Sequence, residues 1–245
     1  AGLVDDQRID ALHAFQRFGV LDQHAHLSAA ADALHTDTLG YTEAVGTLAL
    51  RTAIAGHYAD QYRIEVDPDQ VIVTTGSSGG FLLTLLAAFD AGDLVAITRP
   101  GYPAYRNDIV SLGCRLLELD CGPEVRYQPT VAMLEGLPEK PSGLVIASPA
   151  NPTGTLLSRD ELGGLSQALK ARGGHLVVDE IYHGLTYGMD APSVQPLAAC
   201  SALAARTVRS DSAGTPAIGV SSTIWPSSRT ASSTVSIRSI KRNTL

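Results

Sequence analysis

Three polar side chains stand at the ends of two apolar runs, and together they could hold a pyridine ring that bears a phenolic oxygen. Asn151 follows the run that ends at Ser148, and Asp179 and Tyr182 close the next run. A carboxylate at the end of an apolar strand is costly to bury alone, and a pyridinium N–H would be a suitable partner for Asp179. The Asn151 amide and the Tyr182 hydroxyl could donate to the ring oxygen. Taken singly, an Asn-Pro turn and an Asp that caps a helix explain these residues equally well.

Two further segments could contact such a ligand. The small residues of Thr75–Gly80 follow an apolar run and open a helical pattern, where backbone N–H groups can bind an anion such as phosphate. Their spacing fits neither the dinucleotide-binding motif nor the Walker loop, so an ordinary strand-to-helix turn is the alternative. In Pro100–Tyr105, Tyr102 could stack on a flat ring, with packing of a proline-rich loop as the alternative.

Short apolar runs alternate with helical patterns between about residues 40 and 190, which predicts an α/β fold. Most of the runs are continuous rather than alternating, as in strands that are covered on both faces, so we expect a mostly parallel sheet between two layers of helices. Ser158 and Glu161 form a predicted capping box at the start of one helix. The runs are 71–75, 94–98, 116–119, 144–148 and 176–179, and the expected helix faces are Leu50, Ile54, Tyr58; Phe81, Leu82, Leu85, Leu86, Phe89; and Leu162, Leu165, Leu169.

Composition limits the classes of function. The chain has 245 residues and a formal net charge of −7, which argues against a general nucleic-acid-binding protein. No apolar run approaches the length of a membrane span. The three cysteines have no metal-ligand spacing and predict reduced thiols in a cytoplasmic protein. His24 and His26 lack a placed third ligand, so we expect no metal site there.

The charge balance changes near Pro192. Residues 1–192 contain 12 Lys/Arg and 24 Asp/Glu, whereas residues 193–245 contain 6 Lys/Arg, one acid and 18 Ser/Thr. We therefore divide the chain into a poorly defined N-terminal segment (1–38), a ligand-binding domain (39–192) and a Ser/Thr/Arg-rich tail (193–245). A disordered tail and a tail read in a shifted frame both fit this composition.

The joint order of these motifs resembles the large domain of class I and II aminotransferases, the fold-type I enzymes that depend on pyridoxal 5'-phosphate. The resemblance covers about residues 39–188, and its most specific part is the pair of Asn151–Gly154 and Asp179–Tyr182. It implies a three-layer α/β/α fold. It also implies transfer of an amino group between an amino acid and a 2-oxo acid.

The resemblance also implies roles for individual residues. Ser77, Ser78 and Gly79 would hold the cofactor phosphate, and Tyr102 would stack on the ring. Asn151 and Tyr182 would bind the phenolic oxygen, and Asp179 would keep the ring nitrogen protonated so that the ring accepts electrons. Tyr41 would reach the phosphate bound in a neighbouring subunit of a homodimer.

The chain departs from the family in one decisive respect. The family's chemistry needs a lysine that forms a Schiff base with the cofactor, and the resemblance places it within about Arg209–Gly219, which contains none. The three lysines of the whole chain are Lys140, Lys170 and Lys241, and each has the pattern of a solvated surface residue. The family's C-terminal small domain, with its carboxylate-binding arginine, is not recognisable either.

Three hypotheses follow. The first is an aminotransferase sequence that is truncated in this copy and has no identified catalytic residue. The second is an inactive domain that binds or senses the cofactor without a covalent link. The third is a remnant that only interacts with other proteins.

Overall fold

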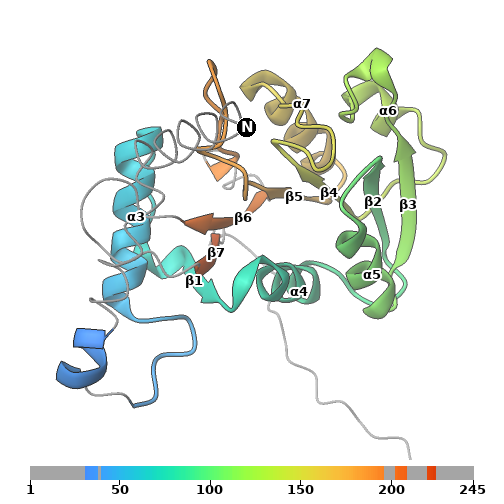
Figure 1. Ribbon diagram of the computed structural model, residues 1–245. Helices are drawn as coiled ribbons and strands as arrows, with labels where there is room; N and C mark the ends of the chain where they lie inside the picture. The colour runs from blue at the N-terminus through green and yellow to red at the C-terminus, as the bar shows by residue number, and fades with distance from the viewer. Residues whose placement is uncertain (1–30, 38–39, 196–201, 209–219, 225–245) are drawn as a thin grey trace, which may run out of the picture.

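The centre of the molecule is one seven-stranded sheet, shown in Figure 1 by a computed structural model that describes residues 31–37, 40–195, 202–208 and 220–224. The strands lie in the order β1-β7-β6-β5-β4-β2-β3. β7 runs antiparallel to its neighbours β1 and β6, and the other strands share one direction. The predicted mostly parallel sheet is thus confirmed. The bounds are β1 (Val71–Thr74), β2 (Leu94–Arg99), β3 (Arg115–Asp120), β4 (Gly143–Ala147), β5 (His175–Asp179), β6 (Ala202–Val208) and β7 (Val220–Ile224).

Helices cover both faces of the sheet, which confirms the predicted three-layer arrangement. In β5, Val177 packs into a cluster with side chains of α4 and α5, whereas Leu176 and Val178 pack with α6 and α7 on the other face. This alternation follows from the two-residue period of a strand. A third cluster joins α3 to Val71 of β1. The helices around the sheet are α3 (Leu48–Tyr62), α4 (Gly76–Ala88), α5 (Pro103–Ser111), α6 (Val131–Glu135) and α7 (Arg159–Lys170), with 3-10 turns at Pro68–Gln70 and Pro123–Val125. A further helical segment covers 31–36.

The helix patterns read from the sequence agree with the structure except in α4. At the start of α7 the Ser158 hydroxyl accepts from the Glu161 N–H, and the Glu161 carboxylate accepts from the Ser158 N–H, so the predicted capping box is present. In α4, however, Leu82 and Leu86 are exposed although both were expected on the buried face. The buried face of α4 is formed by Phe81, Thr84 and Leu85, which are three or four residues apart, and Leu82 and Leu86 lie one position further round the helix.

The packed part of the molecule extends past Pro192, where composition predicted a boundary. Val194 is fully buried and belongs to the core cluster that includes α7. Further along the chain, β6 joins the sheet beside β5, and β7 lies between β6 and β1. The sheet therefore contains backbone from the segment that was expected to be a separate tail.

Two sequence expectations fall on residues beyond the structure's reach. The predicted N-terminal segment, 1–38, is described only for 31–37, so His24 and His26 lie outside the described residues.

Within the described part of the chain, no helix is both long enough and apolar enough to cross a membrane.

Candidate functional site

Most of the predicted ligand-binding residues lie along one edge of the sheet. β1, β2, β4 and β5 share one direction, so their carboxyl ends meet at the same edge, which is where ligands bind in sheets of this kind. The carboxyl end of β1 leads into α4 with Ser77, Ser78 and Gly79, and that of β2 leads to Tyr102. Asn151 follows β4, and Asp179 and Tyr182 come at the end of β5. Tyr41 is different: it is fully exposed ahead of α3.

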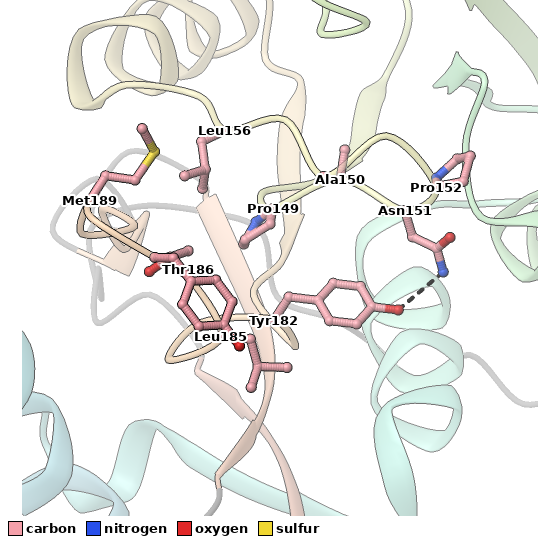
Figure 2. A pocket seen from close by; sticks show the side chains of 11 residues that line it. Pro149, Ala150, Asn151, Pro152, Leu156, Tyr182, Leu185, Thr186 and Met189 are labelled. Carbon is pink, nitrogen blue, oxygen red and sulfur yellow. Dashed lines mark hydrogen bonds between the residues drawn. The ribbon is translucent and has the colours of Figure 1, made fainter. Parts of the chain in front are cut away.

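Asn151 and Tyr182 are in direct contact. The Asn151 amide nitrogen donates to the Tyr182 hydroxyl oxygen at 3.1 Å, as Figure 2 shows. Both side chains line a cavity of about 460 Å³ whose other walls include the apolar side chains of Leu156, Leu185 and Met189. The tyrosine hydroxyl can still donate its own hydrogen. The pair thus presents an amide and a phenol to the same small volume.

The loop that carries Asn151 is fixed by a residue that the sequence did not suggest. The buried Gln128 amide donates to the carbonyl oxygens of Ala147 at 3.3 Å and Thr155 at 2.9 Å, one on each side of the loop. Within the loop, the Gly154 N–H donates to the Ala150 carbonyl at 2.7 Å. Gln128 lies in a connecting segment with no local motif, so no sequence signal marked it.

Asp179 is a buried carboxylate whose partners in the described residues are uncharged. The residue is only 4% exposed. One carboxylate oxygen accepts from the Tyr105 hydroxyl at 2.7 Å, and the other accepts from the Ile181 N–H at 3.0 Å. Burial raises the pKa of Asp179, and these two hydrogen bonds partly oppose the rise because they favour the charged form. A cationic N–H placed beside this carboxylate would stabilise it further.

Tyr105 is the second residue that the sequence analysis left without a role. It lies on α5 with its ring 5.0 Å from that of Phe81 and 5.5 Å from that of Tyr102. Burial raises the pKa of Tyr105, and the adjacent Asp179 charge raises it further, so its hydroxyl stays protonated and acts as a donor. A usable signal was present, because residues three apart on a helix share a face and Tyr102 begins α5 as its N-cap.

Tyr102 owes its position to the glycine before it. A side chain on Gly101 would clash with the backbone carbonyl oxygen of Thr98, so only glycine lets the chain turn so tightly after β2. The turn leaves Tyr102 38% exposed at the carboxyl edge of the sheet. Its ring meets that of Tyr105 edge to face, at an interplanar angle of 82°.

We expect the Tyr105→Phe substitution to raise the pKa of Asp179, because it removes a hydrogen bond that favours the ionised carboxylate. The free energy of unfolding should fall by about 1 kcal/mol at neutral pH. Carbon NMR of labelled aspartate carboxyls across a pH series would measure the pKa, and urea denaturation the stability. Tyr127→Phe, in a loop on the surface, is the matched control. An unchanged Asp179 titration would show that the hydrogen bond does not support the ionised form.

The amino terminus of α4 offers backbone donors at the same edge. α4 begins at Gly76, and its N-cap residue Thr75 makes no side-chain hydrogen bond to the first turn. Ser77 and Gly79 are half-buried and Ser78 is exposed. Uncapped N–H groups and the helix dipole favour an anion at this point.

The two lysines that the structure describes lie at the opposite ends of the strands from the candidate site residues. Lys140 is exposed in the loop that precedes β4, and Lys170 is exposed at the last residue of α7, shortly before β5. Both therefore lie near the amino ends of strands, whereas Asn151 and Asp179 lie at the carboxyl ends. Lys241 is outside the described residues.

Comparison with known proteins agrees with this arrangement. Residues 15–221 match the profile of the family "Aminotransferase class I and II". A valine–pyruvate aminotransferase of Mycobacterium tuberculosis is 52% identical over 160 residues, which are 65% of this chain and 41% of that protein. An aspartate aminotransferase of Thermotoga maritima is 32% identical over 148 residues, or 60% of this chain and 39% of that protein.

Solved structures show the same relation. A crystal structure of an aminotransferase from M. tuberculosis superposes with a TM-score of 0.76 at 42% identity, covering 83% of this chain and 53% of that one. The chain thus spans about 40% of the length of the two curated relatives and about half of the solved structure. The profile match covers most of the chain, including the strand ends that form the candidate site. This chain is therefore a member of the class I and II aminotransferase family.

Proposed function

We propose that this chain forms the pyridoxal 5'-phosphate-binding part of an aminotransferase, which transfers an amino group between an amino acid and a 2-oxo acid. The observation that supports this most strongly is the buried Asp179 carboxylate, whose hydrogen-bond donors among the described residues are the uncharged Tyr105 hydroxyl and Ile181 N–H. A carboxylate so placed suits a pyridinium N–H. Residues 39–192 supply every proposed contact within one subunit.

The remaining donors fit the other parts of the cofactor. Asn151 and Tyr182 would bind its phenolic oxygen, since both already point into one cavity. Tyr102 would stack on the ring. When bound, the cofactor supplies an electron sink for amino-acid chemistry, and Asp179 would maintain that property by keeping the ring nitrogen protonated.

The phosphate would lie against the first turn of α4. Ser77, Ser78 and Gly79 would contribute backbone N–H groups, and the serines also hydroxyls. The helix is 13 residues long and lacks a side-chain cap at this end, so its dipole is available to a phosphate.

The proposed substrates rest on the similarity to known aminotransferases, and the proposed assembly rests on the exposure of Tyr41. The similarity to a valine–pyruvate aminotransferase makes valine and pyruvate the first substrate pair to test. Tyr41, fully exposed in the single chain, would contact the phosphate of a partner subunit in a homodimer. The buried free thiols of Cys114 and Cys121 are consistent with a cytoplasmic protein.

A titration of the protein with pyridoxal phosphate, followed by absorbance and protein fluorescence, tests the proposal. We expect saturable binding that inorganic phosphate weakens by competition. Pyridoxal, which lacks the phosphate, should bind at least tenfold more weakly because it forgoes charge-assisted hydrogen bonds to α4. Equal affinity for the two compounds would contradict the phosphate seat, and the absence of saturable binding would contradict the proposal as a whole.

The position of the two described lysines favours a second candidate, a domain that binds the cofactor without a covalent link. Lys140 and Lys170 both lie near the edge of the sheet opposite Asp179. Treatment of the bound complex with borohydride, followed by peptide mapping, would distinguish the two candidates. A labelled lysine together with turnover of valine would support the aminotransferase, whereas binding with no labelled peptide would support the cofactor-binding domain.

A further inference from the structure

His183 occupies a buried position directly behind the Asn151–Tyr182 pair. It is 7% exposed and follows Tyr182 in the chain. Its Nε2 lies 2.9 Å from the carbonyl oxygen of Ser148, the residue after β4. A carbonyl oxygen only accepts hydrogen bonds, so Nε2 must carry the proton and donate. One imidazole ring therefore links the end of β5 to the end of β4.

The other ring nitrogen has partners from two more segments. Nδ1 lies 3.0 Å from the Tyr62 hydroxyl at the end of α3 and 3.8 Å from a carboxylate oxygen of Glu180. In the neutral ring Nδ1 accepts from Tyr62, and in the charged ring it donates to Tyr62 beside the Glu180 carboxylate. Nε2 carries a proton in both cases, so the bond to Ser148 does not depend on the charge of the ring.

Ser148 is the point from which the Asn151 loop leaves the sheet. Its backbone N–H donates to the Asp179 carbonyl at 3.0 Å, and its hydroxyl accepts from the Leu157 N–H at 3.0 Å. With the His183 bond added, three groups of Ser148 are fixed. Asn151 is only three residues further along the chain, so the position of Ser148 strongly constrains where the Asn151 amide lies.

We infer that His183 is a positioning residue that sets the geometry of the Asn151–Tyr182 pair toward the phenolic oxygen of the bound cofactor. The inference rests on the proposed function. His183 is connected to both members of the pair. It directly follows Tyr182 in the sequence, and its hydrogen bond to the Ser148 carbonyl holds the start of the Asn151 loop. It does not itself line the cavity that Asn151 and Tyr182 share.

The test compares cofactor binding by three histidine variants. His183→Ala removes the tether, and His183→Gln keeps an amide N–H that can reach the Ser148 carbonyl. His175→Ala removes the half-buried histidine at the other end of β5, whose ring contacts Phe89, and is the matched control. Pyridoxal phosphate is titrated into each protein, and the absorption spectrum of the bound cofactor is recorded, since it reports the environment of the phenolic oxygen.

We expect His183→Ala to bind pyridoxal phosphate about tenfold more weakly than the wild type, the effect of one well-placed hydrogen bond. Its bound spectrum should shift toward that of the free cofactor. His183→Gln should recover most of the affinity and the wild-type spectrum. His175→Ala should bind like the wild type even where its thermal stability is lower.

Separate results bear on the two proposals. If wild-type protein fails to bind the cofactor, the proposed function is wrong. If it binds and His183→Ala leaves affinity and spectrum unchanged, the positioning role is wrong. A loss of thermal stability with an unchanged bound spectrum also overturns it, because that is the result of a purely structural role. Should His183→Ala not fold, His183→Asn replaces it, since the shorter amide cannot reach Ser148. The same comparison with His183→Gln then decides.

Discussion

Replacing Asp179 with asparagine is expected to weaken the binding of pyridoxal phosphate about a hundredfold and to stabilise the unliganded protein. Loss of one partner of a buried, hydrogen-bonded charge pair costs about 2–5 kcal/mol of binding free energy. Asparagine has nearly the same shape and carries no charge to bury. Because sites that must hold a ligand are often destabilised without it, we expect the free energy of unfolding to rise by about 1 kcal/mol at neutral pH.

The pH dependence of this stability difference has a defined sign. Burial raises the pKa of Asp179, so the folded protein holds this proton more tightly than the unfolded chain. Stability from this group is greatest below the ordinary pKa of an aspartate and is lost as the pH rises through the raised folded pKa. Asparagine does not titrate. The stability of Asp179→Asn relative to the wild type should therefore grow across that window and become constant above it.

Urea denaturation between pH 3 and pH 8, together with cofactor titration, would measure both effects of Asp179→Asn. Asp60→Asn, an exposed position on α3, is the matched control and should change neither quantity. A variant that binds the cofactor as tightly as the wild type would remove Asp179 from the site. A variant that is less stable at every pH would show that the hydrogen bonds of the carboxylate outweigh the cost of burying it.

Replacing Glu180 with alanine is expected to lower the free energy of unfolding by about 3 kcal/mol, because an unsatisfied buried donor costs about 1–3 kcal/mol and two donors lose their acceptor. Glu180 is completely buried. Its carboxylate accepts from the Ser193 hydroxyl at 3.0 Å and from the Val194 N–H at 2.6 Å. The substitution leaves both donors without this acceptor in a packed interior. It also releases the contact that joins the segment around residue 193 to the end of β5.

Chemical denaturation of Glu180→Ala would measure this loss, and limited proteolysis would show whether the chain is cut more readily around Val194. Glu180→Gln keeps an acceptor oxygen and should lose less stability. Glu135→Ala, an exposed glutamate at the end of α6, is the matched control. A loss below 1 kcal/mol would show that the segment around Ser193 is held by apolar packing rather than by Glu180.

Local pattern was sufficient to predict most of the sheet. The five strand predictions agree with β1 to β5, because continuous apolar runs of this length occur where a strand is covered on both faces. Ser158 and Glu161 likewise predicted the start of α7, since a capping box involves residues only three apart. The order of polar residues predicted that Asn151 and Tyr182 would follow neighbouring strands, and they follow β4 and β5. The hydrogen bond between their side chains was not predicted.

The pattern did not reveal what depends on contacts between distant segments. Tyr105 and Asp179 are 74 residues apart, and their hydrogen bond exists because α5 packs on the face of the sheet toward which Asp179 points. Composition placed a boundary at Pro192, yet the buried Glu180 binds the segment just beyond it.

The sequence alone was enough to locate the strand ends and the polar residues that stand there. The apolar runs that mark a strand are only a few residues long, so they can be recognised without knowledge of the fold. The tertiary structure decided which partners the neighbouring Asp179 and Glu180 carboxylates contact. Asp179 meets Tyr105 on the side of α5, and Glu180 meets Val194 in the cluster on the side of α7. Successive side chains along an extended backbone point to opposite faces, but which face holds the candidate site depends on where the helices pack.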